Sequence, residues 1–129
     1  MEKLKILIAE DDFSSRKVLS KALSKYGECN TTVDGEEAYS AFIEAVNEKT
    51  YYDLVCLDIM MPKLDGLEVL SKIRELEKTK GTNKVKVIML TALDDSKNIF
   101  MAFDEGVEAY IAKPVDIQNL YDVIHKTFM

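Results

Sequence analysis

The sequence predicts an α/β domain in which five parallel strands and five helices, (βα)₅, form a three-layer αβα sandwich around a doubly wound sheet. Short β-rich runs alternate with segments whose apolar residues recur at helical spacing. Strands separated by helices must run parallel, because each helix is a crossover connection. The runs LVCL (54–57) and VIML (87–90) are apolar throughout, which indicates that helices cover both faces of the sheet.

Each predicted strand leads into a predicted helix. The strands cover about 4–9, 29–33, 51–57, 85–90 and 108–113. The first helix ends at Gly27 and carries Leu19, Ala22, Leu23 and Tyr26 on one face. A fourth helix is expected over about 96–105, ending at Gly106, and the last follows Asp116. The length of 129 residues suits one domain, 1–129, with no output domain.

Composition excludes several classes of protein. The net charge of -6 argues against a nucleic-acid-binding face, which would be basic. The sequence contains neither a signal peptide nor an apolar run long enough to span a membrane, so we expect a cytoplasmic protein. Cys29 and Cys56 lie in apolar segments without metal-site spacing, so they are predicted to be buried hydrophobic residues.

Most of the acidic residues have predictable structural roles. Asp34, Asp65 and Asp116 each precede a helix, where a carboxylate accepts hydrogen bonds from free backbone N–H groups. Glu37 follows Asp34 by three residues, as in a capping box. Other acids, Glu77 among them, are expected on solvated helix faces.

Asp11, Asp12 and Asp58 do not fit that account. Asp11 and Asp12 follow the first strand, and Asp58 ends the third. The carboxyl ends of parallel strands meet at one edge of the sheet, so these carboxylates are expected to gather there. Three close carboxylates repel one another unless a cation lies among them, and hard oxygen ligands suit Mg²⁺ or Mn²⁺. The alternative is that Asp12 caps the first helix and Asp58 points to solvent.

Two donor residues end the last two strands. Thr91 follows VIML, and Lys113 follows YIA, so a hydroxyl and an ammonium group should reach the same edge as the acids. Each residue alone would be an ordinary surface or strand-end side chain. Together with carboxylates and a divalent metal, they are typical of sites for phosphoryl transfer, in which positioning and charge neutralisation do most of the catalysis.

The whole chain resembles a response-regulator receiver domain of two-component signalling. Four stretches carry the resemblance: IAEDDFSSR, LDIMMPKLDG, MLTA and YIAKP, in that order. The resemblance implies the strand order 2-1-3-4-5. It also implies that Asp58 is the phosphoacceptor, that Asp11 and Asp12 are the Mg²⁺ pair and that the main-chain carbonyl of Met60 is a further metal ligand.

The resemblance further implies that Thr91 is a switch hydroxyl, that Lys113 meets the phosphoryl oxygens before a cis Lys113–Pro114 bond, and that Tyr110 changes rotamer with Thr91. The first motif leaves one alternative open, because the pair could be Glu10 and Asp11. Alignment of DDFS with the start of the helix favours Asp11 and Asp12, which leaves Glu10 as an extra charge near the rim.

The function expected from this resemblance is a phosphorylation-activated switch rather than an enzyme with turnover. A sensor histidine kinase or a histidine phosphotransfer protein donates the phosphoryl group, and the altered surface recognises a downstream protein or a second copy of the chain. The alternative is a receiver-like scaffold that binds protein without phosphorylation. A flavin protein is disfavoured because EDDF replaces a phosphate-binding loop, and a haloacid-type hydrolase because Met60 replaces its second acid.

Overall fold

The computed structural model describes residues 3–92 and 106–129. Its strands are β1 (Leu4–Ala9), β2 (Gly27–Thr32), β3 (Leu54–Asp58), β4 (Lys86–Thr91) and β5 (Ala109–Ala112). Its helices are α1 (Phe13–Leu23), α2 (Gly35–Glu48), α3 (Gly66–Lys80) and α5 (Ile117–Phe128). The helix expected over about 96–105 lies outside the described residues. Among the described helices, none has the length and apolar character that a membrane crossing requires.

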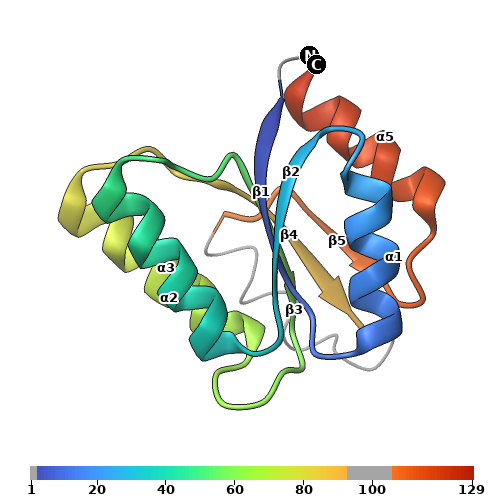
Figure 1. Cartoon of the computed structure of the whole chain (residues 1–129), viewed down its shortest axis with the longest axis horizontal. Helices are drawn as coiled ribbons and strands as arrows, with labels where there is room; N and C mark the ends of the chain where they lie inside the picture. The colour runs from blue at the N-terminus through green and yellow to red at the C-terminus, as the bar shows by residue number, and fades with distance from the viewer. Residues whose placement is uncertain (1–2, 93–105) are drawn as a thin grey trace.

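All five strands are parallel, in the order β2-β1-β3-β4-β5, which confirms the predicted fold class and topology. The first strand lies in the interior of the sheet, where Ala9 pairs with Thr32 on one side and with Leu57 on the other. The residues that follow β1 therefore reach the sheet edge beside the end of β3 (Figure 1), and Asp58 is the last residue of β3.

Helices cover both faces of the sheet, as the apolar strands predicted. Helices α2 and α3 lie on one face, and α1 and α5 lie on the other (Figure 1). Strand β3 serves both cores, because Val55 and Leu57 belong to the cluster under α2 and α3, whereas Leu54 and Cys56 belong to the cluster under α1 and α5. This two-sided burial accounts for the uninterrupted apolar run that ends at Asp58.

The first helix ends earlier than predicted. Its last residue is Leu23, and Gly27 begins β2 instead of ending the helix. A Cβ atom at Gly27 would overlap the backbone of Leu4, so glycine allows the first two strands to approach. The apolar spacing that extended the predicted helix to Tyr26 reflects burial of that side chain in the turn after the helix.

The acidic caps are confirmed, whereas Glu77 corrects the prediction of a solvated face. Asp34, Asp65 and Asp116 each accept backbone N–H groups at the start of a helix. Glu77 is only 3% exposed and pairs with Arg74, which is also buried and whose Nη1 lies 2.9 Å from Glu77 Oε1. Buried charges are usually paired, and this pair ties α3 to the start of β4.

Candidate functional site

Asp58 occupies a shielded position at the carboxyl end of β3. The residue is 3% exposed, and its Oδ1 accepts the N–H of Met60 at 3.2 Å. The next residue is also fixed, because Ile59 donates its N–H to Leu90 in β4 at 3.0 Å. One carboxylate oxygen of Asp58 is therefore held by the backbone of the following loop, and the residue after Asp58 is held by β4.

Gly66 explains why the Asp65–Gly66 pair follows this strand. The Gly66 N–H donates to the carbonyl of Ile59 at 2.8 Å, which brings the first turn of α3 against the end of β3. A Cβ atom on Gly66 would overlap the carbonyl oxygen of Asp58 and lie 2.9 Å from its carbonyl carbon. Only glycine lets helix and strand meet here without displacing the backbone of Asp58.

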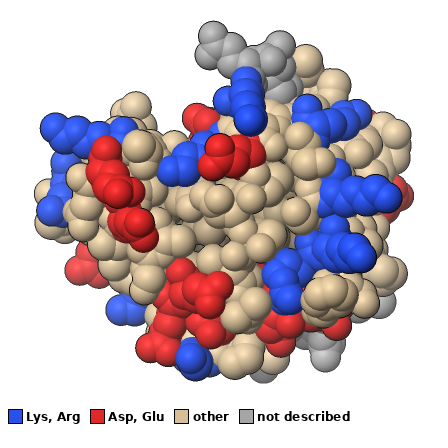
Figure 2. All heavy atoms as spheres, viewed as in Figure 1, with Lys and Arg blue, Asp and Glu red and all other residues tan. Residues whose placement is uncertain are grey.

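Two acids that follow β1 join Asp58. One carboxylate oxygen from each of Glu10, Asp11 and Asp58 lies within 4.8 Å of the others. Glu10 is completely buried, Asp58 is nearly so, and Asp11 is exposed. Acidic side chains also gather toward the lower part of the face in Figure 2, near the ends of the strand arrows in Figure 1. The prediction that acids converge at this edge is confirmed for Asp11 and Asp58.

The structure brings Glu10 into this group in place of Asp12. Asp12 is the N-cap of α1, where its Oδ2 accepts the N–H of Ser15 at 2.8 Å; this hydrogen bond lowers the pKa of Asp12. The expectation that Glu10 is a charge near the rim is wrong. Its N–H still pairs with the carbonyl of Thr32 at 3.1 Å, so the strand pairing continues through Glu10 and its side chain points inward.

The position of the helix cap was the signal that could have identified Glu10. The first helical residue is Phe13, so Asp12 takes the cap position and the two preceding acids remain for the sheet edge. The sequence offered both pairs, and only the point at which the chain leaves the strand distinguishes them.

Lys113 links two of the acids. Its Nζ lies 3.0 Å from Glu10 Oε1 and 3.0 Å from Asp58 Oδ2. Lys113 thus contacts one residue that is 103 positions away in the sequence and another that is 55 positions away. The Lys113 N–H donates to the carbonyl of Thr91 at 2.8 Å, which fixes the Lys113 backbone beside the end of β4. The Lys113–Pro114 bond is cis, as expected. The predicted meeting of this ammonium group with Asp58 is confirmed.

Burial and charge shift the proton affinities of both Lys113 and Glu10. Burial raises the pKa of Glu10, as does its hydrogen bond to Asp58; Lys113 offsets these effects in part, and the result is about 7. Burial lowers the pKa of Lys113, but its bonds to Asp58 and Glu10 outweigh that effect and raise it. The site therefore holds the lysine cation beside an acid that binds its proton more tightly than an ordinary glutamate does.

Thr91 and Met60 lie at the same edge, and Tyr110 lies further back in β5. Thr91 ends β4, is 5% exposed, and its hydroxyl donates to the carbonyl of Ala92 at 3.0 Å. Tyr110 lies in β5, paired with Met89, and packs half-buried against the core under α2 and α3. Met60 is 62% exposed in the loop after Asp58. The switch roles of Thr91 and Tyr110, and metal binding by the Met60 carbonyl, stay predictions.

Comparison with known proteins agrees with this geometry. A family model described as "Response regulator receiver domain" matches residues 6–125. The chain is 40% identical over 119 residues to a probable transcriptional regulator, ycf27, of Guillardia theta, covering 92% of this chain and 42% of the relative. It is 35% identical over 124 residues to hybrid signal transduction histidine kinase I of Dictyostelium discoideum, covering 94% of this chain and 7% of the relative. The chain thus spans less than half the length of these relatives.

Solved structures, one of them of a receiver domain, are also similar to this chain. A CheX-CheY-BeF3-Mg complex from Borrelia burgdorferi is similar with a TM-score of 0.80 and 32% identity, over 98% of this chain and 90% of that one. The receiver domain of the histidine kinase CKI1 from Arabidopsis thaliana, complexed with Mg²⁺ and BeF3⁻, is similar with a TM-score of 0.84 and 27% identity, over 95% and 88%.

Proposed function

Because the chain belongs to the response-regulator receiver domain family, we propose that it is a switch activated when Asp58 accepts a phosphoryl group. Receiver domains are phosphoacceptors rather than classical enzymes. The observation that carries the proposal is the contact of Lys113 with Asp58 and Glu10, beside the exposed carboxylate of Asp11. The site thus combines a shielded nucleophile, a fixed cation and an acidic group suited to a metal.

The donor set fits Mg²⁺. Glu10, Asp11 and Asp58 offer hard carboxylate oxygens within 4.8 Å of one another, and the exposure of Asp11 leaves room for the water ligands that Mg²⁺ retains. The Met60 carbonyl is proposed as a further ligand, and the similar structures named with Mg²⁺ support the assignment. When bound, the ion would neutralise charge on the acids and on the incoming phosphoryl oxygens.

The proposed chemical step takes place at one Asp58 carboxylate oxygen. That oxygen forms a bond to phosphorus while the phosphorus–nitrogen bond of a phosphohistidine donor breaks, and the imidazole nitrogen keeps the bonding electron pair. Lys113 already lies 3.0 Å from Asp58 Oδ2, so its ammonium group can meet the phosphoryl oxygens with little movement. The deep position of Asp58 limits access of other nucleophiles to the acyl phosphate.

The switch would follow from the added charge and acceptor oxygens. Phosphorylation adds between about one and two negative charges, which attract nearby hydroxyl and ammonium donors. Thr91 ends the strand next to Asp58, and movement of its hydroxyl toward the phosphoryl group would change the packing around Tyr110 in β5. We propose that this changes the surface that a partner reads.

The proposed donor is a sensor histidine kinase or a histidine phosphotransfer protein in the cytoplasm. Relatives that include hybrid histidine kinases support a place in two-component signalling. The downstream partner is proposed to be a protein, or a second copy of the chain, that binds the face around Tyr110.

Acetyl phosphate with Mg²⁺ tests the proposal. The wild-type protein should gain the mass of one phosphoryl group in intact-protein mass spectrometry, and chelation of Mg²⁺ should prevent the gain. The Asp58→Asn variant should fold, by circular dichroism, and stay unmodified. A wild-type protein that never gains the mass would favour a scaffold that binds protein without phosphorylation. A variant that gains the mass equally would show that another residue accepts the phosphoryl group and would overturn the assignment of Asp58.

A further inference from the structure

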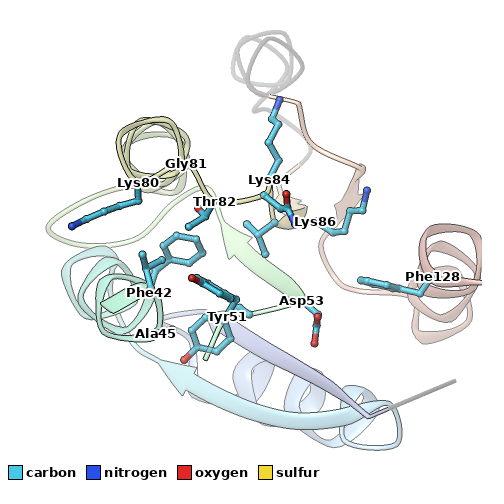
Figure 3. Close-up of a pocket in the computed structure, with 14 residues that line it drawn as sticks. Phe42, Ala45, Tyr51, Asp53, Lys80, Gly81, Thr82, Lys84, Lys86 and Phe128 are labelled. Atoms are coloured by element: carbon cyan, nitrogen blue, oxygen red, sulfur yellow. The ribbon is translucent and has the colours of Figure 1, made fainter. Parts of the chain in front are cut away.

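A pocket opens at the end of the sheet opposite the phosphoacceptor. It has a volume of about 590 Å³ and is lined from four directions: α2, the 51–53 segment before β3, the 80–86 segment before and at the start of β4, and the end of α5 (Figure 3). Asp58 ends β3, whereas Tyr52 and Asp53 precede its start, so the two sites lie at opposite ends of the same strand. The volume falls in the range of small-molecule sites.

Aromatic rings form much of this pocket. Phe42 and Tyr52 are buried and stack with centroids 6.4 Å apart and an interplanar angle of 18°. Tyr51 is 48% exposed and Phe128 is half-buried, and they lie on either side of Asp53 in Figure 3. Exposed ring surface of this kind favours a flat apolar group.

Three lysines stand at the rim of the pocket (Figure 3). Lys80, Lys84 and Lys86 line the pocket, and none of them forms an ion pair with any residue in the two described ranges. Their ammonium ends lie at the outer edge in Figure 3. Among the lining residues that the structure describes, the one acid is Asp53, which already accepts the N–H of Lys5 at 2.8 Å. We call this site, lined by the aromatic rings and these three lysines, the lysine pocket.

The wall that carries Lys84 and Lys86 is held in place by buried charges. Val85 donates its N–H to Glu77 Oε2 at 2.7 Å, and its carbonyl accepts Arg74 Nη1 at 3.1 Å. Thr82, in the same wall, has a buried hydroxyl oxygen with no hydrogen-bond partner in the described chain. Buried hydroxyls normally have partners, so rotation of Thr82 about χ1 toward a ligand would satisfy this one.

We propose that the lysine pocket binds a small organic anion. Its flat apolar body would lie against Tyr51 and Phe128. The side chains of Lys84 and Lys86, whose ammonium ends lie at the outer edge in Figure 3, would turn inward to meet its carboxylate or phosphate. Charge complementarity selects an anion, because Lys80, Lys84 and Lys86 line the pocket and none of them pairs with an acid in the described parts of a chain whose net charge is -6. The site is separate from Asp58, so ligand binding and phosphorylation can be measured independently.

Titration with 2-naphthoate, followed by two-dimensional amide NMR in chelator-containing buffer, tests this inference. The amides of 81–86 should shift in a saturable manner, whereas those around Asp58 and α1 should not. The neutral analogue 2-naphthamide should bind several-fold more weakly. Titration with 2-naphthyl phosphate identifies which anionic group is preferred. The inference is overturned if the 81–86 amides do not respond at millimolar probe, or if the neutral analogue binds equally well.

Matched variants test whether Lys84 and Lys86 bind the anionic group of the probe. The double variant Lys84→Ala/Lys86→Ala should weaken 2-naphthoate binding roughly three- to tenfold, which is the effect of losing two exposed ion pairs. Lys84→Arg/Lys86→Arg should retain binding, and Lys17→Ala/Lys21→Ala on α1 should leave it unchanged. Unchanged binding by the first variant would contradict the proposal.

Two further measurements complete the test. Tyr51→Ser should weaken the neutral and charged probes alike, because it removes ring surface. If 2-naphthoate fails to bind but a peptide rich in aspartate and phenylalanine shifts the 81–86 amides, the pocket is a docking site for a protein and the small-ligand proposal is wrong. Phosphorylation with acetyl phosphate should be unchanged in all these variants, so either proposal can fail without the other.

Discussion

Replacing Gly66 with alanine should destabilise the fold and disturb Asp58 at the same time. The added Cβ would overlap the carbonyl oxygen of Asp58 and lie 2.9 Å from its carbonyl carbon and from the Cα of Ile59. Ordinary van der Waals contact begins near 3.4 Å. All three atoms belong to the backbone, so the strand end and the first turn of α3 must separate by at least several tenths of an ångström.

The expected loss of stability follows from this overlap. Overpacking of a well-packed region costs about 1–3 kcal/mol. Alanine recovers up to about 1 kcal/mol by reducing the entropy of the unfolded chain. The net loss in the free energy of unfolding should therefore be about 1–2 kcal/mol, which is a measurable part of the stability of about 5–15 kcal/mol typical of such domains.

Urea unfolding with a matched variant measures this loss. Gly81 caps α3 with φ of +70°, and its Cβ would meet no atom within 4 Å, so Gly81→Ala costs only backbone strain of about 1–2 kcal/mol. Both variants should lose stability, but only Gly66→Ala should also slow phosphorylation by acetyl phosphate. A Gly66→Ala protein with wild-type stability and labelling would refute the reasoning.

The remaining predictions concern other described residues. Glu10→Gln should weaken Mg²⁺ binding about tenfold in isothermal titration calorimetry. Asp12→Asn should retain Mg²⁺ binding, because asparagine is also a good helix cap. If Asp12→Asn weakened Mg²⁺ binding and Glu10→Gln did not, Asp12 would belong to the metal pair instead of Glu10. Arg74→Met should lower the free energy of unfolding by about 3–5 kcal/mol because it leaves Glu77 buried and unpaired, and urea unfolding within 1 kcal/mol of wild type would contradict this. Burial raises the pKa of Cys56 to about 12, so its thiol should stay protonated and resist alkylation at neutral pH until urea unfolds the protein. Peptide mass spectrometry measures the labelling of this residue. Rapid alkylation of Cys56 in the native protein would contradict its buried position.

The fold and most of the site could be predicted because both depend on simple periodicities. Apolar strands that alternate with helical patterns determine a parallel sheet, and a parallel sheet brings the ends of its strands to one edge. Asp58 and Lys113, 55 residues apart, meet for that reason. The caps Asp34, Asp65 and Asp116 were predictable because capping depends only on local hydrogen bonds.

Two features of the structure could not be predicted from the sequence. One is the exact residue at which a strand ends, and the other is which side chains tertiary packing buries. Glu10 and Asp12 exchange roles according to whether the strand continues one residue further, and periodicity does not locate an end that accurately. Arg74 and Glu77 are charged, as residues on an exposed helix face usually are. Both are nevertheless buried, because backbone groups of Val85 and Gly106 form hydrogen bonds with their side chains. The lysine pocket likewise forms from four separate segments.

Reductive trapping of the phosphorylated protein tests the central claim most directly. Borohydride converts an aspartyl phosphate to homoserine, and peptide mass spectrometry then identifies the residue that carried the phosphoryl group. After incubation with acetyl phosphate and Mg²⁺, we expect homoserine at position 58 and at no other acid. A reduced product at Asp11 or Asp12, or none at any position in protein that has gained the phosphoryl mass, would contradict the account.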